Sequence, residues 1–425
     1  MDHFHERFGE LHAEDVPLTA IAEAVGTPVY VYAEATIVRH FRVFRQALEA
    51  AGIDRPLVAY AVKANPNLSV LAALAREGAG ADVVSEGELH RALAAGVPPG
   101  RILFSGVGKT QAEMAAALQA GILQINVESE EELAELSQVA TALGRRAPVA
   151  LRVNPDVDAR TNPKIATGRG EAKFGIPRDR ILAAWAQAEA LPSLAPTGLA
   201  VHVGSQLTDL APFAAAIRVM GELLAALRSA GHAVRRVDLG GGLGIPYDPS
   251  LPAPPTPADY ARLVAQATAG WGVELAFEPG RLVVGNAGVL LSRVVRVKRG
   301  ATRTFVVLDA AMNDLIRPTL YGVFHHIRAV RPRPGVVNAT FVGPVCETGD
   351  TFAEDRATTP LEPGDLVALM TAGAYGATMA STYNSRPLVP EVLVRGDRWA
   401  LVRPRLTPAE LAAHERLAPW LAEAP

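Results

Sequence analysis

Eight alternations of a helical pattern with a short apolar strand pattern constrain the fold of this 425-residue chain more than any other feature. They run from residue 35 to residue 277, and the helical segments carry apolar residues three or four positions apart. Such alternation predicts a parallel sheet covered by helices. Eight units over about 245 residues have the size of a closed (β/α)8 barrel, or TIM barrel, although an open sheet would alternate in the same way. We therefore predict an α/β fold and favour the barrel.

The predicted strands of the barrel are short. They cover residues 57–62, 81–84, 102–104, 123–127, 148–153, 198–203, 234–239 and 273–277. The predicted helices cover residues 35–50, 68–77, 86–95, 111–120, 130–143, 178–190, 212–230 and 258–270. A long irregular segment, residues 154–177, interrupts the series after the fifth strand. In a barrel, the carboxyl ends of all eight strands would meet at one face.

After residue 281 the pattern changes to strands without intervening helices. Gly, Pro, Asn and Asp separate strand-like segments at residues 289–297, 304–308, 339–342, 366–370, 391–394 and 399–402. A strand at residues 27–32 precedes the barrel series and could join this sheet, and short helices are expected at residues 18–24 and 408–422. We therefore predict an N-terminal segment that contributes to the β domain, a barrel and a C-terminal all-β domain, at residues 1–33, 34–281 and 282–425.

Charge and cysteine content exclude several classes of protein. The net charge of −3 gives no electrostatic basis for binding nucleic acid or an anionic membrane. The single cysteine, Cys346, excludes an intramolecular disulfide and a cysteine metal cluster, and it suits a reducing compartment. The N-terminus lacks the pattern of a signal peptide, and no apolar stretch reaches transmembrane length. We therefore expect a soluble, cytoplasmic protein without nucleic-acid or membrane partners.

Lys63 ends the first barrel strand, within the sequence AYAVKANPN. Burial of an ammonium group is costly unless its pKa falls or a partner compensates it. Only five of the 41 lysines and arginines are lysines, so the chain otherwise takes its positive charge from arginine. A desolvated amine can form an imine with an aldehyde, whereas a guanidinium cannot. Lys63 is therefore a candidate for covalent catalysis, and a simple ion pair, for example with Asp82, is the alternative.

Further unusual residues follow the later barrel strands, where barrels carry their active sites. His202 fits either a core position or a ring-stacking or acid–base role. The glycine run at residues 240–242 would let backbone N–H groups approach a phosphate, and it lacks the G-x-G-x-x-G spacing of a dinucleotide site. Glu278 could pair with Arg281, or it could keep the pyridine nitrogen of a cofactor protonated.

The β segment contributes a second group of candidate residues. Cys346 precedes Glu347, and an accessible thiol beside a carboxylate would be a proton donor or a nucleophile rather than a buried apolar group. Arg317 and Tyr321 form a cationic and aromatic pair suited to a carboxylate. Tyr375 lies in a glycine-rich loop. The sequence therefore suggests that this segment could bind a carboxylate.

Two adjacent histidines in the same segment carry less functional signal. His325 and His326 lack the spaced acidic residues of a metal site. We therefore treat both as structural and predict no metal.

Taken in order, these motifs resemble the diaminopimelate decarboxylase family of fold-type III pyridoxal-phosphate enzymes. The resemblance extends over nearly the whole chain, through YAVKAN, ADVVSEGEL, RVNPDVDA, KFGI, HVGSQ, GGGLG, EPGR, IRPTLYG, GPVCETGD and GAYG. This family pairs an alanine-racemase-like barrel with a β domain. The resemblance therefore implies that architecture and pyridoxal 5'-phosphate as the cofactor.

The resemblance also implies a role for each matching residue. Lys63 would hold the cofactor covalently, and Cys346 would return a proton to the substrate carbanion. The implied cofactor-binding residues are Lys63, His202, Ser205, Gly240, Gly241, Gly242, Glu278, Pro279, Gly280, Arg281 and Tyr375. The implied substrate-binding residues are Arg281, Arg317, Tyr321, Glu347 and Tyr375.

An activity and an assembly follow from the same resemblance. The implied reaction is decarboxylation of meso-2,6-diaminopimelate to L-lysine and CO2, the last step of lysine biosynthesis. The implied partners are a small-molecule amino-acid substrate and a second copy of the chain. In that homodimer, Cys346 and Glu347 of one subunit would complete the active site of the other.

Three other activities stay open. Related decarboxylases act on ornithine, arginine or carrier-tethered amino acids, although Cys-Glu favours the diaminopimelate branch over the usual Cys-Asp of the ornithine and arginine branches. A racemase would usually carry a catalytic tyrosine in the β domain, where this chain has Cys346. A non-catalytic cofactor-binding homologue would usually be a barrel alone.

The sequence departs from the family at residues 162–164, where we would expect an aromatic residue or histidine. This departure puts the substrate contacts of the loop in question.

Overall fold

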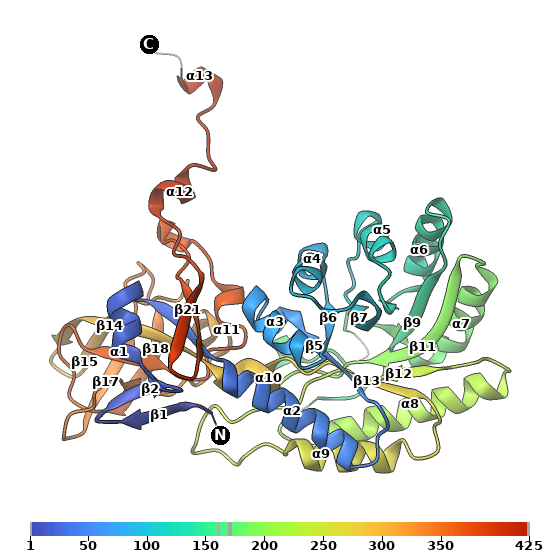
Figure 1. The fold of residues 1–425 in the computed structure, drawn as a ribbon, viewed down its shortest axis with the longest axis horizontal. Coiled ribbons are helices and arrows are strands. Elements are labelled where there is room, and N and C mark those ends of the chain that lie inside the picture. The colour runs from blue at the N-terminus through green and yellow to red at the C-terminus, as the bar shows by residue number, and fades with distance from the viewer. Residues whose placement is uncertain (1, 160, 169–171, 423–425) are drawn as a thin grey trace. The chain divides into compact units, whose positions relative to one another are not determined.

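Eight parallel strands close into a barrel in the computed structural model, which describes residues 2–159, 161–168 and 172–422 (Figure 1). In order around the ring they are β5 (Leu57–Ala61), β6 (Gly80–Val83), β7 (Ile102–Phe104), β8 (Gln124–Val127), β9 (Ala147–Asn154), β11 (Leu194–Val201), β12 (Arg236–Asp238) and β13 (Glu274–Phe277). A parallel pairing of β13 with β5 closes the ring. The predicted (β/α)8 barrel is therefore confirmed, and the open sheet is excluded.

Helices alternate with these strands along the chain. They are α2 (Glu34–Ala50), α3 (Leu68–Arg76), α4 (Glu86–Ala94), α5 (Gln111–Ala120), α6 (Glu130–Ala142), α7 (Ile181–Ala190), α8 (Ala211–Ser229), α9 (Pro257–Ala267) and the short α10 (Arg281–Val284). Polar N-caps explain several helix starts, because the side chains of Ser85, Thr110 and Ser129 accept hydrogen bonds from backbone N–H groups of the first turn. Within the described ranges, no helix has the length and apolar character to cross a membrane.

The chain forms two units. One contains Thr36–Gly285 and includes the barrel, and the other combines Met1–Ala35 with Asn286–Pro425. In the second unit, one sheet has the strand order β18-β17-β15-β14-β4-β20-β21, with β19 paired to β14 and β16 paired to β19. These strands are β4 (Val29–Ala33), β14 (Gly288–Arg299), β15 (Thr304–Leu308), β16 (Ile327–Ala329), β17 (Val337–Val342), β18 (Thr351–Thr358), β19 (Leu366–Leu369), β20 (Glu391–Arg395) and β21 (Arg398–Arg403).

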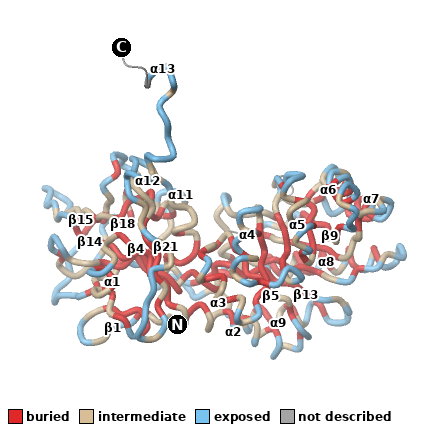
Figure 2. Tube along the Cα trace, turned by 45° about the horizontal axis from the view of Figure 1, so that its top comes forward, coloured by how far each residue is buried: buried red, intermediate tan, exposed pale blue. Residues whose placement is uncertain are grey.

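The N-terminal strand β4 lies inside this sheet, between strands from the far end of the sequence. It runs antiparallel to β14, with Tyr32 opposite Gly288, and parallel to β20, with Tyr30 opposite Glu391. Every residue of β4 is buried, and buried residues are red in Figure 2. A strand that is covered on both faces reads as an uninterrupted apolar and aromatic run, here VYVYA. The prediction that an N-terminal strand joins the C-terminal β domain is confirmed.

Some elements differ from the sequence prediction. The pattern misses β16 and β18 and a small antiparallel sheet of β1 (Phe4–Arg7), β2 (Glu10–Ala13) and β3 (Val16–Pro17). In β18 the sequence TFAEDRAT is too charged to show an apolar alternation. The helix at residues 18–24 is present as α1 (Leu18–Val25), but the helix expected at residues 408–422 is two short ones, α12 (Pro408–Ala412) and α13 (Pro419–Ala422). Pro419 restricts the residue before it and cannot continue a helix.

The long segment at residues 154–177 is irregular, as predicted. Its described part contains a 3₁₀ turn (Pro163–Ile165) and the two-residue strand β10 (Ile176–Pro177), which pairs with the end of β9. The departing residues 162–164 form this turn, in which the Asn162 side chain accepts the N–H of Lys164 at 3.0 Å. Residues 160 and 169–171 lie outside the described residues.

Candidate active site

Lys63 lies in the 3₁₀ turn Val62–Ala64, directly after β5. Its Nζ is 2.7 Å from Oδ2 of Asp82, which belongs to β6. The Asp82 side chain is fully buried, whereas 35% of the Lys63 side chain is exposed. Lys63 also lines a cavity of about 330 Å³ in the barrel unit. The ion pair that the sequence left as an alternative is therefore present, and the paired amine still faces a space that can hold a small molecule.

The cavity is lined largely by residues from the carboxyl ends of the barrel strands. They include Lys63, Ser105, Asn126, Arg152, Thr167, Phe174, His202, Asp238 and Glu278. Active sites of barrel enzymes are built at this face, from the ends of several strands. The structure thus brings together the residues that we singled out after the first, sixth and eighth strands.

Glu278 and Asp238 are neighbouring buried carboxyl groups in this lining. Ser105 Oγ lies 3.5 Å from Glu278 Oε1, and the Gly240 N–H donates to Asp238 Oδ1 at 2.9 Å. Burial raises the pKa of Glu278 well above its ordinary range, and the charges of Asp238 and Asp82 raise it further. Burial also raises the pKa of Asp238. The pair therefore holds a proton to a higher pH than ordinary carboxyl groups do, because ionisation of one buried carboxyl group opposes ionisation of its neighbour.

Buried polar side chains continue from this pair through the barrel. Asn126 Nδ2 donates to Ser105 Oγ at 3.0 Å, and Gln124 Nε2 donates to Asn126 Oδ1 at 2.8 Å. Arg236 Nη1 donates to Gln124 Oε1 at 3.0 Å. Because each of these buried groups has a partner, the line of hydrogen bonds fixes the side chains next to Glu278.

His202 follows β11 and presents its ring to the cavity. Its Nδ1 accepts the Gly241 N–H at 3.1 Å, so the ring proton of the neutral form is on Nε2. Burial lowers the pKa of His202 well below its ordinary range, and the cations Lys63 and Arg152 lower it further. A neutral imidazole is suited to stacking on an aromatic ring, and it is a poor proton donor at neutral pH.

The glycine run after β12 leaves no room for side chains. A Cβ on Gly240 would lie 2.4 Å from the Val201 carbonyl oxygen, and a Cβ on Gly241 would lie 2.1 Å from that of Glu278. At Gly242 the backbone has a φ of 117°, and a Cβ would lie 2.3 Å from the carbonyl oxygen of Gly204. Only glycine satisfies these positions, so the loop brings bare backbone to the rim of the site.

Arg281, at the start of α10, is hydrogen-bonded to two hydroxyl groups. Its Nη1 donates to Tyr247 Oη at 2.7 Å, and its Nη2 donates to Ser205 Oγ at 3.1 Å. The Pro279 carbonyl accepts the last N–H of β5 at 3.2 Å, which fixes this loop to the strand that precedes Lys63. A Cβ on Gly280 would press within 3.1 Å of two alanine methyl groups. The loop is thus tightly held against the barrel.

In the second unit, α11 (Arg317–Tyr321) carries two of the predicted substrate-binding residues. Arg317 is buried, and its Nη1 lies 3.4 Å from Nε2 of His325. Tyr321, at the other end of this short helix, is half-buried. Tyr375 follows β19 with a φ of 55°, a conformation that residues other than glycine seldom adopt and that is often found at functional sites.

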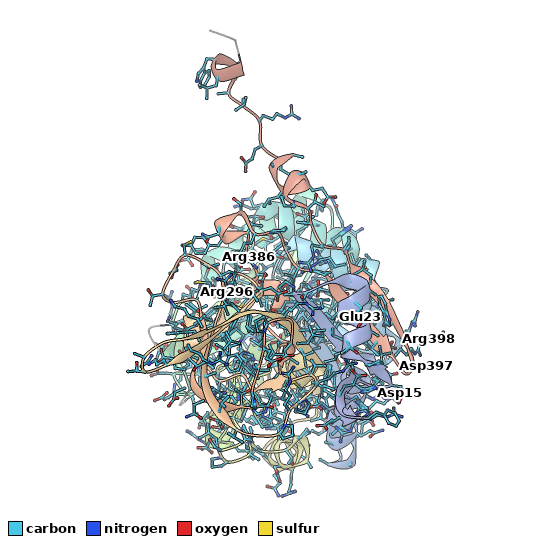
Figure 3. All side chains as sticks on the ribbon, turned by 90° about the vertical axis from the view of Figure 1, so that its left-hand side faces the viewer. Asp15, Glu23, Arg296, Arg386, Asp397 and Arg398 are labelled. Atoms are coloured by element: carbon cyan, nitrogen blue, oxygen red, sulfur yellow. The ribbon has the colours of Figure 1, made fainter. Side chains whose placement is uncertain are left out.

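Cys346 and Glu347 meet a loop that the sequence did not link to them. The Cys346 thiol is exposed, and its backbone N–H donates to Asn384 Oδ1 at 3.2 Å. Glu347 accepts a hydrogen bond from Tyr383, which raises the pKa of that phenol. Arg386, labelled in Figure 3, anchors the same loop, because its Nε donates to an asparagine side chain at 3.2 Å. The accessible thiol that the proton-donor hypothesis requires is present.

Comparisons with known proteins identify the family. A family model described as "Pyridoxal-dependent decarboxylase, pyridoxal binding domain" matches residues 34–285. The chain is 52% identical to a diaminopimelate decarboxylase from Zymomonas mobilis over 98% of this chain and 99% of the relative. It is 50% identical to one from Pseudomonas aeruginosa over 99% and 100% of the two chains. The chain belongs to the pyridoxal-dependent decarboxylase family, in its diaminopimelate decarboxylase branch.

Solved structures of this decarboxylase family have the same fold. A diaminopimelate decarboxylase from M. jannaschii in complex with L-lysine superposes with a TM-score of 0.95, at 35% identity over 99% of both chains. One from Helicobacter pylori, also in complex with L-lysine, gives 0.90 at 38% identity and covers 93% of this chain and 98% of that one. The alanine-racemase-like barrel with a β domain, which the motifs implied, is thereby confirmed.

The lining of the barrel cavity fits pyridoxal phosphate, the cofactor of this decarboxylase family. Lys63 offers a primary amine to an aldehyde, His202 a neutral ring to an aromatic face, and Glu278 a carboxyl group to a ring nitrogen. The glycine loop offers the bare backbone that a phosphate needs, and the Arg281 guanidinium and the Ser205 hydroxyl adjoin each other. These donor types match an aldehyde, a pyridine and a phosphate group.

Several residues of the site carry a signal that the sequence analysis did not use. Asp238 lies two residues before Gly240, Ser105 directly follows the apolar strand β7, and Asn126 is the last residue but one of β8. A polar residue at such a strand end is a detectable signal. Tyr383 lies 36 positions from Glu347, and Asn384 lies 38 positions from Cys346. No local pattern links the two segments.

Proposed function

We propose that this protein decarboxylates meso-diaminopimelate to L-lysine and CO2 with pyridoxal 5'-phosphate as its cofactor. The choice of substrate rests on one observation. About half of all residues, over nearly the full length, are identical to those of relatives named diaminopimelate decarboxylase. The Cys-Glu pair at residues 346 and 347 supports the same branch of the family.

The barrel residues would hold the cofactor. Lys63 would bind the aldehyde carbon, His202 would stack on the ring, and Glu278 would face the ring nitrogen. The phosphate would be held by Ser205, Gly240, Gly241, Gly242, Pro279, Gly280 and Arg281, with Tyr375 contributed by the β unit. When bound, pyridoxal phosphate supplies an electron sink for the carbon–carbon bond that breaks as CO2 leaves.

The carboxyl groups of Glu278 and Asp238 would control the charge on the ring nitrogen of the cofactor. Burial raises the pKa of Glu278, so its carboxyl group binds a proton to a higher pH than an ordinary glutamate, and once that proton is on the ring nitrogen the Glu278 carboxylate would stabilise the positive charge there. Neutral His202 contributes no competing charge at the ring face. The Asp82 carboxylate accepts a hydrogen bond from the Lys63 ammonium group and positions the amine at the cavity.

The residues of the β unit would bind substrate and return the proton. Arg317, with Arg281, would bind carboxylate groups, and Glu347 would bind the distal ammonium group. Tyr321 and Tyr375 would complete the contacts. Cys346 would donate its thiol proton to the substrate Cα after CO2 leaves, and its exposure supports this role.

A substrate panel with product identification tests the function. The purified protein, supplied with pyridoxal phosphate, should release one CO2 per meso-diaminopimelate consumed and yield L-lysine on a chiral column. Ornithine, arginine and L-lysine should be turned over at most slowly, because they lack the second carboxylate for which the cations are present. Turnover of one of these amino acids instead would refute meso-diaminopimelate as the substrate, but it would still support decarboxylation with pyridoxal phosphate. A racemised product without CO2 would refute both.

We further propose a cytoplasmic homodimer in which Cys346 and Glu347 of one subunit serve the barrel of the other. The single cysteine supports a reducing compartment. Mixing Lys63→Ala subunits with Cys346→Ala subunits tests the shared site, because a mixed dimer would keep one intact site and recover up to about a quarter of wild-type activity. Each variant alone is the control. A mixture that exchanges subunits and stays inactive would contradict the shared site.

A further inference from the structure

His325 is held in one tautomer by a backbone carbonyl group. Its Nδ1 lies 2.9 Å from the carbonyl oxygen of Met370, just after β19. A carbonyl oxygen only accepts hydrogen bonds, so Nδ1 carries the ring proton. In the neutral ring Nε2 is then an acceptor. The imidazole is 1% exposed, so the packed protein rather than solvent sets its orientation.

The acceptor nitrogen of His325 faces the guanidinium group of Arg317. Nη1 of Arg317 lies 3.4 Å from Nε2, and Arg317 is itself only 3% exposed. The guanidinium group can only donate, so this contact requires the unprotonated Nε2 that the Met370 carbonyl selects. Arg356 of β18 also contacts His325, because its Nη1 donates to the His325 carbonyl oxygen at 3.3 Å.

We propose that His325 is a positioning residue that fixes the guanidinium group of Arg317 for the carboxylate of the substrate. The Met370 carbonyl orients the imidazole, and the imidazole orients Arg317 through Nε2. Arg317 has a fork of donors whose value for a carboxylate depends on its rotation. This inference rests on the proposed function, since it assigns the carboxylate at Arg317 to the amino-acid substrate. The neighbouring His326 is exposed, and its ring stacks on that of Phe324.

A double-mutant cycle between His325 and Arg317 tests the proposal on the full-length, cofactor-loaded enzyme. His325→Leu should raise the KM for meso-diaminopimelate about tenfold while kcat changes less than about threefold, because the change affects binding more than chemistry. His325→Gln should recover part of the loss, because its amide oxygen can accept from Arg317. In an Arg317→Lys background, His325→Leu should add little, because the guanidinium group that it orients is already gone.

His326→Leu is the matched control and should leave both kinetic constants within about twofold of wild type, as expected for an exposed position. The cofactor absorbance of each variant shows whether the barrel site is intact. Equal effects of His325→Leu in the wild-type and Arg317→Lys backgrounds would overturn the proposal, as would an unchanged KM or no recovery with glutamine. If wild-type enzyme releases no CO2 from meso-diaminopimelate, the proposed function fails. The cycle, measured with the amino acid that the panel then identifies, still decides the role of His325.

Discussion

Nζ of Lys63 lies 2.7 Å from Oδ2 of Asp82, and the two side chains differ in exposure, with 35% of the lysine and none of the aspartate accessible. The buried carboxylate thus holds an amine that remains reachable from the cavity. An ion pair with this asymmetry positions the lysine without closing it off. It separates two properties of Lys63, its charge and its nucleophilic nitrogen, and these can be tested one at a time.

We expect Lys63→Arg to retain the positive charge at this position but to lose the ability to bind the cofactor covalently. An arginine can still pair with Asp82, but a guanidinium group does not form a stable imine, so CO2 release should fall at least about 1,000-fold. The measurement is CO2 release together with borohydride reduction and mass spectrometry of the cofactor adduct. Lys63→Ala is the companion variant that removes both properties. An adduct at another lysine in either variant would show that the site is misassigned.

Glu88 is expected to make stability depend on pH. Burial raises the pKa of its carboxyl group from 4.5 to about 7 in the folded protein. The folded state therefore binds more protons than the unfolded state between these values, and stability falls as the pH rises through this window. Glu88→Gln removes the effect and keeps an acceptor for the Val84 N–H, which Glu88 Oε2 accepts at 2.9 Å.

We expect Glu88→Gln to be about 2 kcal/mol more stable than wild type at pH 8 and close to it at pH 4.5. Urea unfolding of the protein without cofactor, at both pH values, measures the difference. Glu86→Gln, an exposed substitution on the same helix, is the control and should shift neither curve. A gain that is the same at both pH values would show that Glu88 is not the titrating group.

Gly241→Ala should weaken cofactor binding and stability together. The new methyl group would lie 2.1 Å from the Glu278 carbonyl oxygen, so the end of β13 must move. We expect the dissociation constant for pyridoxal phosphate to rise more than about tenfold, since the loop and Glu278 shift as one. Fluorescence titration with the cofactor measures this. Gly100→Ala has open space around its Cβ and should bind the cofactor like wild type.

Cys346 should react as a single accessible thiol. The chain has no other cysteine, and this one is exposed, so a thiol reagent should modify one equivalent in the native protein. Alkylation should abolish CO2 release in parallel, and Cys346→Ser should lower kcat about 100-fold, because a hydroxyl group is a weaker acid than a thiol. Full activity of the alkylated enzyme would exclude the thiol as the proton donor.

The barrel and the residues around Lys63 could be predicted because their signals are local. A strand followed by an unusual residue occurs at Lys63, His202 and Glu278, and parallel strands in a barrel place such residues at one face. The glycine loop is likewise visible in sequence, because no other residue fits bare backbone contacts. Each of these features depends on a few consecutive residues.

The remaining features depend on contacts between distant segments. Tyr383 reaches Glu347 through a loop whose position is set by the fold of the β unit, and no spacing rule encodes that contact. The raised pKa of Glu278 arises mainly from burial, which the sequence does not report. His325 was interpreted as structural because the sequence lacks the spaced acidic residues of a metal site, whereas its partners are Arg317 and a carbonyl group after β19.

The position of β4 has a consequence for synthesis on the ribosome. Residues 29–33 emerge early, but their partners β14 and β20 lie at residues 288–299 and 391–395. The barrel, whose strands all lie between residues 57 and 277, has the contacts it needs before the second unit can assemble. The aromatic strand β4 therefore remains unpaired while some 250 further residues are synthesised, at about 5–20 residues per second. Chaperones that bind the nascent chain should therefore bind mainly at this N-terminal strand.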